Sequence, residues 1–240
     1  MSRSVDKFLK GLDELNISLS DEQIGAFLQY YELLIDKNKV MNLTAITEYE
    51  EVVQKHFLDS LSITKIMDLS EIKKIIDIGT GAGFPGIPLK IAFPHLEVVL
   101  LDSLNKRVNF LNDVCRILQL QKIEAYHGRA EEYGRKKEFR EQFDLCVSRA
   151  VANLSTLSEY CLPFVAVDGY FIPYKAGNVE EEVKQAGNAI RKLSGKLEEK
   201  KEFLLPDSDI SRVMLKIKKI KPIAKAYPRK AGLPGKEPLQ

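Results

Sequence analysis

Several features that would direct the interpretation elsewhere are missing from this sequence. No apolar run, such as Val98–Leu101, approaches the roughly 20 residues that a membrane-spanning helix needs. The first sixteen residues contain no apolar segment of the signal-peptide kind. The three cysteines lack zinc-type spacing, and their odd number argues against a disulfide framework. We therefore expect a cytoplasmic, reduced protein without a metal site or a membrane segment. The cysteines are Cys115, Cys146 and Cys161.

The net charge of +2 hides an uneven distribution. Nine Lys or Arg against one acid give residues 212–240 a charge of +8, so residues 1–211 carry −6. A basic segment of this kind suggests a polyanionic partner, of which nucleic acid is the usual one. The alternative is a solvated, lysine-rich edge strand that resists aggregation. Charge alone does not decide between a nucleic-acid partner and a solvated edge strand.

Residues 1–70 show helical patterns, and we expect them to form a helical segment packed on a core domain of residues 71–240. Ser20-x-x-Gln23 has the form of a capping box before a segment with apolar residues at helical spacing. Thr47-x-x-Glu50 has the same form and predicts a second helix start.

From residue 72 onward, short apolar runs alternate with longer amphipathic ones. This alternation predicts an α/β fold, with a mostly parallel sheet covered by helices on both faces. The last two strands have no helix between them and predict a terminal antiparallel hairpin, giving seven strands. The expected strands are 74–78, 97–101, 122–126, 143–148, 167–173, 197–205 and 212–220, and the expected helices are 84–92, 104–119, one beginning near 130, 153–164 and 178–192.

The segment 75–86, IIDIGTGAGFPG, is a glycine-rich turn that follows a short apolar run. Gly81-x-Gly83-x-x-Gly86 matches the dinucleotide-binding fingerprint, and Asp102 lies about 20 residues on, where that fingerprint expects a ribose-binding acid. A dinucleotide fold, however, normally continues with three further strand–helix units, which this chain does not have. The match to the fingerprint is therefore weak.

The residues around the turn favour a ligand without a pyrophosphate. Asp77 precedes the turn, where a carboxylate suits a cationic amino group and opposes phosphate. Phe84 and Pro85 occupy the opening of the helix, where free amides would be needed to hold phosphate oxygens. Gly79 completes an Asp-x-Gly-x-Gly-x-Gly pattern. This pattern is typical of Rossmann-like class I methyltransferases, which bind S-adenosylmethionine.

In this interpretation Gly79, Gly81 and Gly83 let the chain pass beneath the methionine part of the cofactor, where a Cβ would collide. Asp102 accepts hydrogen bonds from the ribose hydroxyls. The Ala130–Glu131 backbone and side chain lie near the edge of adenine. The simpler alternative is that Asp77 and Asp102 only cap neighbouring helices.

Motifs along nearly the whole chain resemble one family, the bacterial small-subunit (16S) ribosomal RNA methyltransferase G, or glucose-inhibited division protein B. The resemblance rests on NKVMNLTAIT with VVQKHFLDSL, IDIGTGAGFPGIPL, LLDSLNKRVNFL, HGRAEEY, SRAVANL and YPRKAGLPGKEPL. It implies transfer of a methyl group from S-adenosylmethionine to N7 of a guanine in 16S ribosomal RNA of the small subunit, with no obligate protein partner. It also implies cofactor contacts at Gly79, Phe84, Ala130–Glu131 and Arg149.

The residues agree with this chemistry. Guanine N7 carries a free lone pair, so in-line attack on the methyl group requires no general base, and orientation supplies most of the catalysis. Enzymes that methylate exocyclic amines carry Asn/Asp-Pro-Pro-Tyr after the fourth strand, where this chain has SRAVAN. Methylation of pyrimidine C5 needs a cysteine nucleophile, whereas Cys146 and Cys161 lie in apolar segments and read as core residues.

Arg149 is the predicted catalytic residue. It ends the fourth strand, at the edge where open α/β sheets bind ligands, and it can hold guanine O6 or a flanking phosphate. The alternative role is a salt bridge to Asp77 or Asp144. His56 is interpreted as a structural residue. The predicted RNA contacts are Asn42, Lys175, Arg212, Arg229 and Lys230, each of which has a solvated surface position as its alternative.

Three other functions stay open at this point. A small-molecule or protein methyltransferase shares the cofactor but leaves the basic segment unexplained. A nicotinamide-dependent oxidoreductase would use the dinucleotide fingerprint. A ribosome assembly factor without catalysis would retain the fold but not take up the cofactor.

Overall fold

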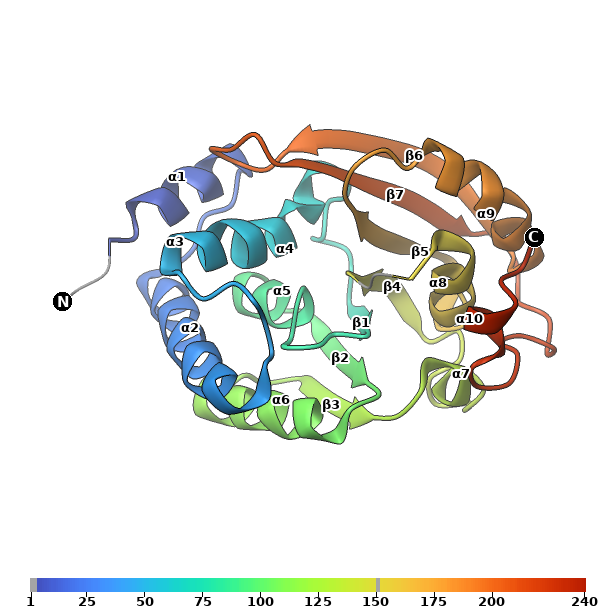
Figure 1. Ribbon diagram of the computed structural model, residues 1–240, viewed down its shortest axis with the longest axis horizontal. Coiled ribbons are helices and arrows are strands. Elements are labelled where there is room, and N and C mark those ends of the chain that lie inside the picture. The colour runs from blue at the N-terminus through green and yellow to red at the C-terminus, as the bar shows by residue number, and fades with distance from the viewer. Residues whose placement is uncertain (1–3, 150–151) are drawn as a thin grey trace.

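A seven-stranded sheet forms the centre of the computed structural model, which describes residues 4–149 and 152–240 (Figure 1). The strand order is β3-β2-β1-β4-β5-β7-β6. The first five strands pair in parallel, and β7 runs antiparallel to both β5 and β6. The predicted mostly parallel sheet with a terminal antiparallel hairpin is confirmed. The strands are β1 (Lys74–Ile78), β2 (Glu97–Asp102), β3 (Ile123–His127), β4 (Phe143–Ser148), β5 (Val165–Lys175), β6 (Gly195–Leu204) and β7 (Ser211–Lys219).

Helices cover both faces of this sheet (Figure 1). In the described ranges, none of them is long and apolar enough to cross a membrane. The helices are α1 (Asp6–Glu14), α2 (Asp21–Met41), α3 (Tyr49–Val52), the π-helix η1 (Val53–Leu58), α4 (Asp59–Leu61), the 3-10 helix η2 (Ser62–Lys65), α5 (Gly86–Ala92), α6 (Asn105–Ile117), α7 (Ala130–Tyr133), α8 (Leu154–Cys161), α9 (Glu180–Lys192) and α10 (Leu233–Lys236).

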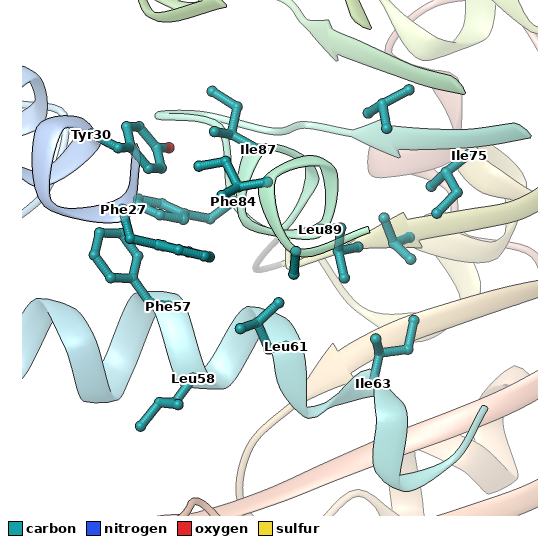
Figure 2. Packing of buried hydrophobic residues seen from close by; sticks show 14 of the residues in the cluster. Phe27, Tyr30, Phe57, Leu58, Leu61, Ile63, Ile75, Phe84, Ile87 and Leu89 are labelled. Atoms are coloured by element: carbon teal, nitrogen blue, oxygen red, sulfur yellow. The ribbon is translucent and has the colours of Figure 1, made fainter. Parts of the chain in front are cut away.

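The N-terminal helices share one apolar core with a face of the sheet. Phe27 and Tyr30 of α2 meet Phe57 of η1 and Phe84 of the glycine turn, with ring centroids 5.0 Å apart for Phe27–Phe57 and 5.4 Å for Tyr30–Phe84 (Figure 2). Each such buried side chain contributes roughly 1.5–3 kcal/mol through removal from water. Cys146 and Cys161 lie fully buried in the second core, on the other face under α8 and α9, as expected.

The two predicted capping boxes have different outcomes. At Ser20 the box is present in full: the Ser20 hydroxyl accepts from the Gln23 amide, and the Gln23 side chain accepts from the Ser20 amide. At Thr47 the prediction is wrong, because α3 begins at Tyr49 and has Glu48 as its N-cap without a side-chain hydrogen bond. The Thr47 carbonyl instead accepts from the Tyr31 hydroxyl at 2.9 Å. This contact with α2 fixes the chain before the helix starts.

The strand order reverses between β1 and β4, which are neighbours in the sheet but not in the chain. Ligands of open α/β sheets bind in the crevice outside the carboxyl ends of the strands at such a point. The reversal brings the turn after β1 close to the residue that follows β4. It therefore places the glycine turn beside Arg149.

Candidate active site

The glycine turn after β1 forms part of the wall of a cavity of about 490 Å³. Gly81 lies in the left-handed region with φ +63°, and a Cβ built on it would find no protein atom nearer than the Gly79 carbonyl oxygen, at 4.0 Å. The space above Gly81 is therefore kept open by the lack of a side chain. This is the arrangement expected if a ligand approaches the backbone closely.

Gly83 has a different role from the one predicted. A Cβ at this position would lie 2.5 Å from Ile87 Cδ1 and 2.6 Å from the Tyr30 hydroxyl, both of which belong to the core. The Tyr30 hydroxyl in turn donates to the Ala82 carbonyl at 2.6 Å. Gly83 therefore allows the turn to pack against α2, and its contact with the cofactor stays a prediction.

Asp77 lies beneath the turn and is fully buried. Its Oδ2 accepts hydrogen bonds from the Thr80 hydroxyl at 2.7 Å and from the Gly86 amide at 2.9 Å. Its Oδ1 has no hydrogen-bond partner within the described residues. Burial raises the pKa of this carboxyl to about 7, against the lowering effect of the two hydrogen bonds. Asp77 thus holds the turn from below, and its second oxygen is buried without a hydrogen-bond partner among the described residues.

Asp102 connects the end of β2 to the same turn. Its Oδ2 accepts from the Gly81 amide at 2.9 Å and its Oδ1 from the Leu104 amide at 2.9 Å, while an Arg107 nitrogen lies 3.4 Å from Oδ2. The carboxylate therefore does hold the start of the next helix, as the simpler alternative suggested. It also lines the 490 Å³ cavity, where carboxylate lone pairs accept from hydroxyl groups.

A second cavity of about 220 Å³ continues from the first and shares Gly79 and Ser103 with it. Its lining is mainly apolar, which suits a flat aromatic ring. Ala130 and Glu131 line it as predicted, but the Glu131 side chain is buried and its Oε1 accepts from the Gly232 amide at 2.7 Å. One carboxylate oxygen of Glu131 is thus bound to the C-terminal segment, and its contact with the adenine of a cofactor stays a prediction.

Arg149 is held by an acid that the sequence analysis did not single out. Its Nη1 donates to Asp59 Oδ2 at 2.6 Å and to the Lys55 carbonyl at 3.1 Å. Neither alternative partner proposed for it is used: Asp77 is bound within the turn, and Asp144 Oδ2 accepts from the amides of residues 73 and 74. The guanidinium carbon lies 5.2 Å from the centroid of the Phe84 ring. Arg149 is therefore fixed above the glycine turn.

His56 completes this wall of the cavity. Its ring stacks on Phe84, with centroids 4.5 Å apart at 19°. Nε2 lies 2.9 Å from the Thr44 hydroxyl, and Nδ1 lies 3.2 Å from Arg149 Nη2. Burial, followed by the charge of Arg149, lowers the pKa of His56 to about 3, so the ring is neutral at physiological pH. Nδ1 also lies 3.0 Å from the Lys55 carbonyl oxygen, so both ring nitrogens have hydrogen-bond partners.

A third cavity, of about 310 Å³, opens beside the first and shares His56 and Arg149 with it. Two predicted RNA contacts, Lys175 and Arg212, line it. Arg212 Nε donates to Asp59 Oδ1 at 2.7 Å, and Lys175 Nζ lies 2.7 Å from Glu182 Oε1. Lys55 also lines the space. We call this third cavity the cationic mouth.

The other predicted RNA contacts lie elsewhere. Arg229 makes a two-pronged pair with the fully buried Glu159, at 2.7–3.0 Å. Its guanidinium therefore anchors the C-terminal segment, and the phosphate contact stays a prediction. Lys230 is exposed beside it. Asn42, also exposed, ends α2 in the left-handed conformation just before the loop residues that line the first cavity.

Two residues of this site were missed or undervalued in the sequence analysis. Asp59 was not a candidate, although it lies in the HFLDSL part of a motif that carries the family resemblance. His56 was interpreted as structural; it is buried and hydrogen-bonded, but it also separates the first cavity from the cationic mouth. The signal available in the sequence was a histidine and an acid three residues apart in one short helical segment.

Comparison with known proteins agrees with this architecture. Residues 23–210 match the family model for rRNA small subunit methyltransferase G. Proteins named "Ribosomal RNA small subunit methyltransferase G" are 56% identical over 99% of this chain and 98% of the relative in Lachnoclostridium phytofermentans, and 53% identical over 96% of each chain in Alkaliphilus metalliredigens.

Solved structures resemble the fold at low sequence identity. A SAM dependent methyltransferase from Aquifex aeolicus is similar over 73% of this chain and 96% of its own, with a TM-score of 0.52 and 15% identity. The M. jannaschii TYW2 protein in complex with AdoMet is similar over 62% and 70%, with a TM-score of 0.50 and 15% identity. The class I methyltransferase fold is thus confirmed. On the full-length relatives and the family model, this chain belongs to the rRNA small subunit methyltransferase G family.

Proposed function

We propose that this protein transfers a methyl group from S-adenosylmethionine to N7 of a guanine in the 16S ribosomal RNA of the small subunit, and that it acts in the cytoplasm. One observation carries the proposal. Two neighbouring cavities, one at the glycine turn and one at the cationic mouth, share His56 and Arg149 as lining residues. Such an arrangement fits a cofactor on one side of these residues and a polyanion on the other.

The residues of the first two cavities fit S-adenosylmethionine. The open backbone at Gly81 leaves room for the methionine part, and the buried carboxyl of Asp77 holds the turn in place beneath it. Asp102 is placed for the ribose hydroxyls, and the apolar 220 Å³ cavity for adenine. When bound, the cofactor supplies a methyl group on a sulfonium centre.

The residues shared by the two cavities suit a reaction that moves no proton. His56 is neutral, and its ring nitrogens face Arg149 and Thr44. Guanine N7 is already a free nucleophile, so the requirement is to hold the base with N7 toward the methyl group. Arg149 can donate a hydrogen bond to guanine O6, an acceptor that adenine lacks, and leave N7 free. In this proposal Arg149 orients the base and distinguishes guanine.

The other methylation chemistries have less support. The segment after β4 lacks the Asn/Asp-Pro-Pro-Tyr tetrad of exocyclic amine methylation. Methylation of pyrimidine C5 needs a cysteine thiolate, but burial raises the pKa of Cys146 well above its usual value. A buried, protonated thiol is a poor nucleophile.

The test is methyl transfer from labelled S-adenosylmethionine to purified small ribosomal subunits and, in a separate arm, to the naked RNA. We expect the label in RNA as 7-methylguanosine at one position. Replacement of Arg149 by Gln should reduce transfer, while S-adenosylhomocysteine should still raise the melting temperature of that variant. Label in protein, in a small molecule, or at an exocyclic amine would contradict the proposal.

A further inference from the structure

Asp59 is an acidic residue in the lining of the cationic mouth, whose other charged lining residues are Lys55, Arg149, Lys175 and Arg212. It begins α4 and is almost completely buried, with 4% of its side chain exposed. Its two oxygens pair with arginines from different strand ends: Oδ2 with Arg149 after β4, at 2.6 Å, and Oδ1 with Arg212 at the start of β7, at 2.7 Å. The side chains of these arginines are only 17% and 19% exposed. We call these three residues the Asp59 triad.

The triad carries a net charge of +1, whereas the two arginines alone would carry +2. For a surface that only has to attract RNA phosphates, a carboxylate is unfavourable, because affinity for a polyanion grows with the number of uncompensated cations. Arg149 and Arg212 belong to different strand ends, so a shared carboxylate is not required to keep their charges apart. The presence of Asp59 therefore requires a reason other than attraction of RNA.

The charge balance of the proposed reaction provides one. The N7 lone pair of guanine forms the new N–C bond, the electrons of the broken C–S bond stay on sulfur, and no proton moves. Guanine begins neutral and ends with a formal charge of +1, and the sulfonium loses its charge, so the positive charge moves to the base and the total is unchanged. This charge develops beside the guanidinium of Arg149, which is the group proposed to hold O6. Without a compensating anion, the positive charges on the base and on the arginines repel each other.

We propose that Asp59 is a positioning residue that fixes Arg149 and limits the positive charge around the guanine, at the expense of affinity for RNA. This inference rests on the proposed function. It predicts that loss of the carboxylate has opposite effects on binding and on turnover. A residue that only maintains the fold would reduce both together.

The main variant is Asp59→Asn, which keeps the shape and removes the charge. We expect it to bind the RNA substrate two- to tenfold more tightly in the absence of any cofactor, with a salt dependence steeper by about 0.7–1 in log–log slope, the value for one added phosphate contact. At saturating RNA we expect kcat to fall about 10- to 100-fold, as for one unit charge several Å away at an effective dielectric of about 20. Asp59→Glu, which restores the charge, should recover turnover in part.

Charge-matched variants separate charge from shape. Arg212→Gln makes the triad neutral, and we expect the reverse pattern: weaker RNA binding, a shallower salt slope and a kcat raised two- to tenfold. Asp59→Asn with Arg212→Gln returns the triad to +1, so its kcat should be higher than that of Asp59→Asn alone. The Arg212→Gln comparison remains decisive if Asp59→Asn does not fold, which melting curves with S-adenosylhomocysteine will show.

The inference is overturned if Asp59→Asn weakens RNA binding and turnover in parallel, if the double variant shows no recovery, or if Arg212→Gln lowers kcat. The wild-type product, mapped in the same assay, keeps the two proposals distinct. If the wild-type protein forms no 7-methylguanosine, the proposed function fails. If it does and the variants behave as just described, only the inference about Asp59 fails.

Discussion

Substitutions at Gly81 and Gly83 should separate binding from folding, although the two glycines are only two residues apart. Gly81→Ala places a methyl group in the open space of the first cavity, where the nearest protein atom is 4.0 Å away. Gly83→Ala places the same methyl group 2.5 Å and 2.6 Å from core atoms of Ile87 and Tyr30. Each variant is thus the control for the other.

The two costs follow from the geometry. Gly81 has φ +63°, so an alanine there costs about 1–2 kcal/mol in backbone strain, or about 2–8 °C in melting temperature for a chain of this size. Gly83 has φ +105°, and strain of about 1–3 kcal/mol is joined by an overpacking cost of about 1–3 kcal/mol. Its melting temperature should therefore fall by about 4–24 °C.

The assay is thermal unfolding with and without S-adenosylhomocysteine. At 100 times its Kd the ligand stabilises the wild-type protein by about 2.7 kcal/mol, which corresponds to about 5–11 °C. We expect Gly81→Ala to lose most of this ligand-dependent shift, and Gly83→Ala to retain it at a much lower starting temperature. A full shift in Gly81→Ala, or a loss of stability equal to that of Gly83→Ala, would refute the assignment of the open space above Gly81 to the cofactor.

Three further predictions concern acids of the site and of the C-terminal anchor. Asp102→Ala should weaken binding of S-adenosylhomocysteine by about 1–3 kcal/mol, since ribose hydroxyls and the Gly81 amide lose their acceptor; calorimetry that finds wild-type affinity would exclude this role. Because burial raises the pKa of Asp77 from 3.8 to about 7, its protonated form favours the folded state. The free energy of unfolding of the wild-type protein relative to that of Asp77→Asn should therefore be highest below pH 4 and decline as the pH rises to about 7. Urea titrations that give a constant difference in this free energy over the same range would contradict the burial argument. Glu159→Gln removes the charge of a buried carboxylate that pairs with Arg229, and it should lower the free energy of unfolding by about 3–5 kcal/mol. Proteolysis of residues 227–240 should become faster. If the free energy of unfolding stays unchanged, Arg229 is not an anchor.

The sheet could be predicted from sequence because its signals are local. Parallel strands buried on both faces appear as short apolar runs, and every predicted strand begins and ends within two residues of the observed one. The hairpin of β6 and β7 followed from the lack of a helix between them. The Thr47 capping box failed because the contact with Tyr31, sixteen residues away, decides where the next helix starts.

The site could be predicted only in part. Arg149 and Asp102 follow strand ends, so topology alone places them at the crevice. Asp59 could not be found in this way, because its partners are 90 and 153 residues away and meet it only when the sheet forms. The same limit applies to Arg229: a basic residue in a basic segment resembles an RNA contact until its buried acid, seventy residues away in α8, is known.

The anchoring of the C-terminal segment has a consequence for how the protein is made. Residues 227–240 supply the partners of two buried carboxylates: the Gly232 amide donates to Glu131, which lines the 220 Å³ cavity, and Arg229 pairs with Glu159. Until these residues leave the ribosome, both acids lack their partners and the cavity lacks part of its support. A nascent chain can therefore build most of its sheet during translation, but it becomes competent to take up its nucleoside ligand only after residues 227–240 have been added and have docked.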